Sequence, residues 1–177
     1  MHYVHVLALA LAACDAGPGP APDPGVSTGT FTAVLNGEPF EAPATYFAND
    51  YGFFFLRATV ADSSLYPPYV QTVEFFAPGS GLHKGEVRPF IEEGSGAPAA
   101  FVSEQIGDGV LMQFSPVAGA VGGLHVVEAD SAAGRLRATF EGTFAAISPQ
   151  RSEYQRLPDT LRFTNGQFVI DLDSGKE

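Results

Sequence analysis

The alternation of apolar and polar residues in Arg135–Ile147 limits the fold more than any other feature of the chain. Every second position is apolar or small, namely Leu136, Ala138, Phe140, Gly142, Phe144 and Ala146. The positions between them are polar or charged, namely Arg135, Arg137, Thr139, Glu141 and Thr143. In a strand, a pattern that repeats every two residues puts successive side chains on opposite faces. The segment is therefore predicted to be a strand with one buried face and one face in water.

Short runs of this kind recur throughout the chain after Gly29, and none has convincing helical periodicity. Asn36-Gly37 separates two of them and is a strong signal for a tight hairpin. A second Asn-Gly pair separates Leu161–Thr164 from Gln167–Leu172, which predicts another hairpin. About ten short strands joined by such turns predict an all-β fold, an antiparallel β-sandwich or a barrel-like domain.

Two segments have patterns of their own. Phe53–Leu56 is a continuous apolar run, which predicts a strand buried on both faces. Leu82–Ile91 contains Gly85 and Pro89, so it is predicted to be irregular or an edge strand. Further strands are expected at 46–48, 52–60, 69–77, 100–105, 110–114 and 124–129.

The first fourteen residues contain a short apolar run that ends at the only cysteine of the chain. Val6–Ala13 is an apolar run of eight residues, far short of the ~20 that a spanning helix needs, and it fits the core of a secretory signal. The run ends Leu-Ala-Ala-Cys, which is similar to the lipobox of bacterial lipoproteins, and this resemblance implies lipidation of Cys14. Met1–His5 contains no Lys or Arg, so either its histidines suffice or the true start lies upstream. The alternative for Cys14 is an ordinary buried thiol.

A tether is expected directly after Cys14. Residues 15–29 alternate proline with small residues and so favour an extended chain over a packed core. At about 3.1 Å per residue such a segment reaches up to ~40 Å. We therefore divide the chain into a signal peptide at 1–13, a lipidated cysteine and linker at 14–29, one β domain at 30–173 and a tail at 174–177.

Both ends of the expected domain resemble small, largely uncharacterised lipoproteins of Gram-negative bacteria. The opening segment is TFTAVLNGEPFEA (30–42), and the closing segments are VVEADSAAGRLRATFEGTFAA (126–146) and RFTNGQFVIDL (162–172). The matching positions are Asn36, Gly37, Asp130, Gly134, Gly142, Thr143, Phe144, Asn165, Gly166 and Phe168. These are turn and core residues, so the resemblance implies a fold and a location in the cell envelope but no catalytic residues.

Charge and composition exclude several function classes. The net charge is −11 and the only lysines are Lys84 and Lys176. Because nucleic-acid binding and docking on anionic lipid both need clustered cations, neither partner is expected. A single cysteine leaves no intramolecular disulfide.

The residues that could carry chemistry do not form a recognisable pattern. His83 and His125 lack the spacing of a zinc site, and no Gly-x-Ser-x-Gly elbow is present. Asp171 with Asp173, or Glu92 with Glu93, could supply oxygens to Ca²⁺, but a solvated acidic face is the better interpretation. No cofactor, metal or enzymatic activity is therefore expected.

Four tyrosines near expected loops, Tyr46, Tyr51, Tyr66 and Tyr69, are the candidate ligand-binding residues. Exposed aromatic residues can anchor a glycan or a protein partner, although tyrosines also cap β cores with the hydroxyl in water. The expected function is a lipid-anchored, non-catalytic binding or accessory module in the cell envelope, outside the cytoplasm, with a glycan or envelope protein as partner. The alternatives are an envelope hydrolase with an unrecognised active site and a passive structural lipoprotein.

Overall fold

The computed structural model describes residues 26–48, 53–78, 81–90, 99–117, 120, 122–147 and 155–172. These residues form ten strands and no helix, which confirms the all-β prediction. The strands are β1 (Ser27–Leu35), β2 (Glu38–Ala48), β3 (Phe53–Asp62), β4 (Tyr69–Pro78), β5 (Val87–Pro89), β6 (Ala100–Ile106), β7 (Gly109–Pro116), β8 (Gly123–Asp130), β9 (Arg135–Ala146) and β10 (Thr160–Asp171). The predicted signal peptide at 1–13, Cys14, most of the predicted linker and the predicted tail at 174–177 lie outside the described residues.

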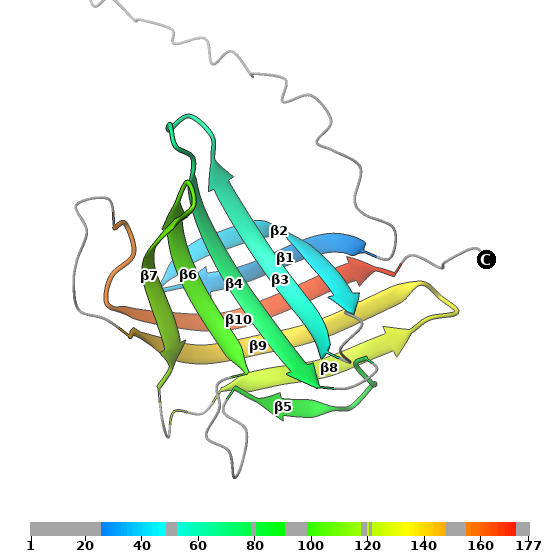
Figure 1. Cartoon of the computed structure of the whole chain (residues 1–177). Coiled ribbons are helices and arrows are strands. Elements are labelled where there is room, and N and C mark those ends of the chain that lie inside the picture. The colour runs from blue at the N-terminus through cyan, green and yellow to red at the C-terminus, as the bar shows by residue number, and fades with distance from the viewer. Residues whose placement is uncertain are drawn as a thin grey trace, which may run out of the picture.

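Eight of these strands close into an antiparallel barrel (Figure 1). Its order is β1-β2-β3-β4-β6-β7-β9-β10, and β10 pairs with β1 to complete the ring. Strand β9 is long enough to pair with two strands along the same edge. It pairs with β8 from Arg135 to Glu141 and with β7 from Phe144 to Ala146. Strands β8 and β5 therefore extend the sheet beyond the barrel, below it in the view of Figure 1.

Aromatic side chains fill the interior of the barrel. Its largest fully buried residues are Phe31, Phe54, Phe75, Phe114, Phe140, Phe144, Phe163 and Phe168. Most of these rings contact one another, with centroids 4.4 Å apart for Phe31 and Phe168 and 5.7 Å apart for Phe31 and Phe140. Such pairs contribute about 0.5–1.5 kcal/mol each beyond burial of their area. The described interior is thus a packed core, as small eight-stranded barrels allow.

Phe90, just after β5, completes this core from outside the ring of strands. Its ring lies 4.8 Å from that of Phe140 and 5.4 Å from that of Phe144. Gly142 makes room for it, because a Cβ at that position would lie 2.2 Å from a Phe90 ring carbon. The expected edge strand within Leu82–Ile91 is confirmed by β5, three residues long at the end of the sheet order.

The two Asn-Gly pairs adopt different structures, and only the first is a hairpin turn. Asn36 and Gly37 both have positive φ, 52° and 93°, and turn β1 into β2 as predicted. The hairpin predicted at Asn165-Gly166 is wrong, because β10 continues through both residues while pairing with β1 and β9. Asn165 is left-handed, with φ 53°, and the register of β10 with both neighbours shifts there. These are features of a β-bulge within one strand.

The prediction that Phe53–Leu56 is buried on both faces is also wrong. Phe54 and Leu56 are completely buried in the barrel, whereas Phe53 is 37% exposed and Phe55 is partly exposed. Successive side chains of β3 therefore alternate between the core and the outer wall. By contrast, the alternation predicted for Arg135–Ile147 is confirmed in β9, where residues 136 to 144 alternate between buried and partly or fully exposed.

Candidate binding face

The outer wall over β3, β4, β6 and β7 carries a row of uncharged polar side chains. Backbone pairing aligns Thr59 with Thr72, Thr72 with Ser103, and Ser103 with Gln113. All four alternate in sequence with buried residues, so they face outward. The row crosses four strands near the middle of the wall.

A hollow of about 460 Å³ lies along this row. Its lining residues, named here the polar hollow, are Arg57, Thr59, Thr72, Glu74, Phe101, Ser103, Gln105, Val110 and Gln113. The hydroxyl and amide side chains among them can each donate and accept hydrogen bonds. Phe101 and Val110 add apolar surface, so the hollow combines a few polar groups with apolar contact area, as small-molecule sites do.

Arg57 and Glu74 are the two ionisable residues in the polar hollow, and they neutralise each other. Nε and Nη2 of Arg57 both contact Oε2 of Glu74 at 2.5 Å. Because both side chains are partly in water, the pair contributes little to stability. Its consequence is electrostatic, since the polar hollow has no net charge although the whole chain carries −11.

Four stacked phenylalanines, named here the phenyl ladder, cross the same wall beside the polar hollow. They are Phe47 of β2, Phe55 of β3, Phe76 of β4 and Phe101 of β6, all partly exposed. Centroids are 4.8 Å apart for Phe47 and Phe55, 6.2 Å for Phe55 and Phe76, and 5.7 Å for Phe76 and Phe101. The guanidinium of Arg57 lies 5.4 Å from the Phe47 centroid, within cation–π range.

The candidate tyrosines do not form one exposed surface. Tyr66 is 101% exposed at the tip of the β3–β4 loop, whereas Tyr69 is 3% exposed and directs its hydroxyl into the barrel. Tyr46 is half-buried, and burial raises its pKa despite a hydrogen bond with the backbone of Leu82. Tyr51 lies outside the described residues, as does Cys14. Tyr46 pairs with Leu56 and Tyr69 pairs with Asp62, near opposite ends of β3, so the structure does not bring the described tyrosines together.

Glu104, which the sequence analysis did not single out, is buried at one end of the barrel. Its exposed fraction is 0%, and Oε1 accepts backbone N–H groups from Arg156 and Leu157 at 2.9 and 2.8 Å. The Tyr69 hydroxyl donates to the same oxygen and accepts a hydrogen bond from Gln71. Glu104 therefore fastens the segment before β10 to β4 and β6. The sequence signal for the burial of Glu104 is its spacing: it lies two residues after Val102 and therefore on the same, inward face of β6.

The surroundings of Tyr69 explain why its pKa is high. Burial disfavours the phenolate, and the hydrogen bond to the Glu104 carboxylate disfavours it further, so both raise the pKa of Tyr69 above its usual range. The Arg156 guanidinium lies 4.2 Å from the Tyr69 ring and pairs with Asp62 at 3.0 Å. Hydrogen bonds from Ser64 and Arg156 lower the pKa of Asp62.

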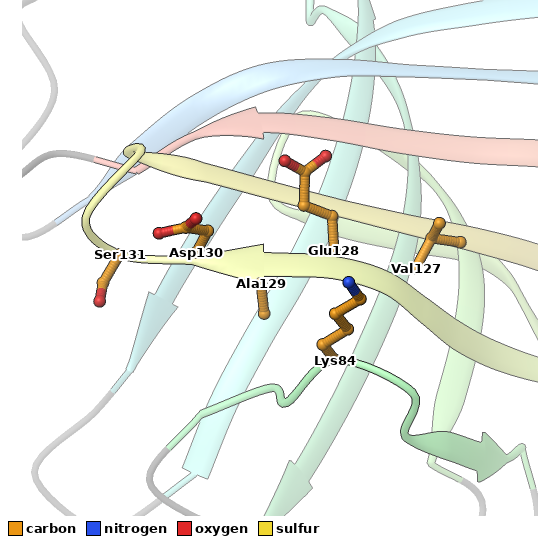
Figure 2. A pocket seen from close by; sticks show the side chains of 6 residues that line it. All are labelled: Lys84, Val127, Glu128, Ala129, Asp130 and Ser131. Carbon is orange, nitrogen blue, oxygen red and sulfur yellow. The ribbon is translucent and has the colours of Figure 1, made fainter.

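A second hollow, of about 410 Å³, lies between Lys84 and the end of β8 (Figure 2). It is lined by Lys84, Val127, Glu128, Ala129, Asp130 and Ser131, and the Lys84 side chain extends toward β8. Its lining contains one cation and two carboxylates, so the second hollow is acidic overall. It has no aromatic wall and only one hydroxyl side chain. The polar hollow offers more hydrogen-bonding side chains on one surface.

The two histidines among the described residues, His83 and His125, are exposed, and neither belongs to a cluster of ligands. The backbone N–H of His83 donates to Glu86, while His125 lines a third hollow of about 270 Å³ with Thr139 and Glu141. Within the described ranges, no group of three or more His, Cys, Asp or Glu residues could hold a metal ion. The same ranges contain no helix that is long and apolar enough to span a membrane.

Comparison with known proteins adds no further information about the site. No protein-family model, no curated protein and no solved structure matches the chain.

Proposed function

We propose that this chain is a lipid-anchored binding module of the cell envelope, and that it holds a neutral glycan in the polar hollow without transforming it. The observation that carries the proposal is the hydroxyl- and amide-rich lining of the polar hollow, which has no net charge and lies beside the ring of Phe101. The anchor rests on the lipobox-like Leu-Ala-Ala-Cys segment and the proline-rich stretch after it.

The chemistry of the hollow favours a polyhydroxylated ligand over an ionic one. A sugar presents hydroxyl groups that donate and accept, and these match the side chains of Thr72, Ser103 and Gln105. Its C–H surface matches the exposed part of Phe101. A strongly charged ligand would have to compete with the Arg57–Glu74 ion pair and would leave one of those charges without its partner.

The anchor supplies the reason for a binding module of this kind. Several acyl chains on one residue give stable membrane attachment, because each buried CH₂ contributes about 0.8 kcal/mol. A barrel held on a tether would then keep its ligand close to the membrane surface. Binding in such a setting needs only modest affinity, since the tether confines the protein where envelope polymers are concentrated.

The anchor is tested by metabolic labelling with a fatty-acid probe. We expect the probe to label the protein, and Cys14→Ala to abolish the label, because Cys14 is the only thiol in the chain. Equal labelling of the two proteins, or none of the unaltered protein, would refute the anchor. This outcome would leave the glycan proposal to its own test.

Glycan binding is tested by retention on immobilised maltohexaose, cellohexaose and chitohexaose. We expect at least one of these oligosaccharides to retain the protein, and Gln105→Leu to weaken retention about threefold to tenfold, the equivalent of one hydrogen bond. Gln167→Leu is the matched control, because Gln167 lies outward on β10, away from the polar hollow. Equal weakening by both variants, no retention by any of the three, or hydrolysis of the bound oligosaccharide would contradict the proposal.

A further inference from the structure

The phenyl ladder puts apolar surface on the outside of a barrel whose interior already holds its aromatic core. Phe47, Phe55 and Phe76 remain partly exposed, and Phe53, which precedes Phe55 on the same face of β3, is 37% exposed. Phe53, Phe55 and Phe76 point outward because their neighbours Phe54 and Phe75 are buried, and Phe47 stacks on Phe55. Contiguous apolar surface of this kind is typical of an interaction site.

The ladder lies at the end of the barrel where the chain enters from the N-terminal segment. Strand β1 begins at Ser27, which pairs with Tyr46, the residue directly before Phe47. The opposite end of β3 leads to the β3–β4 loop and Tyr66 (Figure 1). The ladder is thus next to the point where the chain from Cys14 joins the barrel.

We infer that the phenyl ladder docks this end of the barrel on the interface of a lipid bilayer. This inference rests on the proposed function, because the lipid anchor at Cys14 would bring a membrane within reach of the barrel. The twelve residues between Cys14 and Ser27, 15–26, span at most ~40 Å when extended at about 3.1 Å per residue. That length holds the N-terminal end of the barrel close to the membrane, with the ladder beside it.

The chemistry of the ladder suits a bilayer interface. The rings stack on one another, so they offer ring edges to a partner and require no hydrogen bonds from it. Aromatic side chains are favoured at the boundary between headgroups and acyl chains. The net charge of −11 opposes approach to an anionic surface, so the matching surface is zwitterionic.

The absence of tryptophan from the chain allows a site-specific test. In the full chain with Cys14→Ala, which has no lipid, Phe55→Trp places a single fluorophore in the ladder. With phosphatidylcholine vesicles we expect its emission to move to shorter wavelength and to be quenched by brominated acyl chains. Replacing a fraction of the lipid with phosphatidylglycerol should reduce both effects. Phe47→Ser with Phe76→Ser should remove them.

Tyr66→Trp is the matched control, because it places the same fluorophore at the opposite end of β3. Its emission should stay at the wavelength found in water, even if the apolar segment near the N-terminus brings the chain to the vesicle. An unchanged emission at position 55, or the same shift at positions 55 and 66, would overturn the inference. If Phe55→Trp does not fold, Phe53→Trp repeats the measurement from the exposed end of the same face.

This test separates the ladder from the anchor and from the glycan site. It uses protein without lipid, so failed lipidation in the labelling experiment leaves its outcome unaffected. It also leaves Gln105, Ser103 and Thr72 unchanged, so a loss of vesicle binding is distinguishable from a loss of glycan binding.

Discussion

Glu104 is the residue on which one end of the barrel depends. Its Oε1 collects three hydrogen bonds, two from the backbone of Arg156 and Leu157 and one from Tyr69. Its Oε2 is buried and has no hydrogen-bond partner among the described residues. A buried carboxylate with several donors is costly to remove, because each donor left unpaired retains its desolvation penalty.

We therefore expect Glu104→Ala to lower the free energy of unfolding by about 2–4 kcal/mol, in line with the loss of a buried hydrogen-bond network. Urea denaturation measures the change. Gln105→Ala, one residue further along β6 but directed outward, should cost less than about 1 kcal/mol. Similar losses for the two variants would show that Glu104 does not fasten the segment before β10.

Because of Tyr69, the free energy of unfolding should depend on pH in the alkaline range. Its pKa is raised in the folded protein, so the unfolded chain loses the phenolic proton first. The stabilisation is complete below the ordinary tyrosine pKa of about 10 and is lost as pH rises from there toward the folded value. Urea denaturation between pH 9 and pH 11 should show stability falling less steeply for Tyr69→Phe than for the unaltered protein. Equal slopes would contradict the assignment.

At the scale of the element, the two Asn-Gly pairs show which turns can be predicted from local sequence and which cannot. The hairpin at Asn36-Gly37 was predictable, because a left-handed Asn followed by Gly turns two strands that are neighbours in sequence. The same pair at 165–166 lies within one strand, and only its pairing with β1 and β9 determines this. Those partners are distant in the chain, so local turn chemistry could not distinguish a bulge from a turn.

Gly166 should be among the least replaceable residues of β10. A Cβ there would lie 2.3 Å from the carbonyl oxygen of Phe140 in β9, so the backbone of one strand would have to move. We expect Gly166→Ala to lower the free energy of unfolding by more than about 2 kcal/mol. The control is Gly109→Ala, whose Cβ would meet its nearest atom at an ordinary 3.5 Å. A loss no greater than that of the control would argue against the bulge.

The candidate site was less predictable than the strands, and the reason is also nonlocal. Tyr46, Tyr66 and Tyr69 looked alike in sequence, yet their exposures range from 3% for Tyr69 to 101% for Tyr66. The polar hollow collects residues from four strands, and the register that aligns Thr59, Thr72 and Ser103 is a property of the sheet. Because Phe53–Leu56 is a continuous apolar run, the outward direction of Phe53 and Phe55 could not be predicted from the sequence pattern.

At the scale of the whole molecule, closure of the barrel determines which surfaces remain for binding. Because phenylalanines fill the described interior, the proposed ligand site is a hollow on the outer wall. The polar hollow spans β3, β4, β6 and β7, between the phenyl ladder and the β3–β4 loop. In the proposed arrangement, Phe47, Phe55 and Phe76 of the ladder contact the membrane, and the hollow, which Phe101 borders, faces the envelope polymers above it.

Binding of a neutral glycan in the polar hollow is tested most directly by site-resolved NMR titration. Backbone amide spectra of the protein are recorded with maltohexaose, cellohexaose or chitohexaose added. We expect saturable shifts, for at least one of the three, that concentrate at Thr72, Ser103, Gln105 and Gln113. Unchanged spectra with all three, or shifts that concentrate around Lys84 and Asp130 at the second hollow, would contradict it.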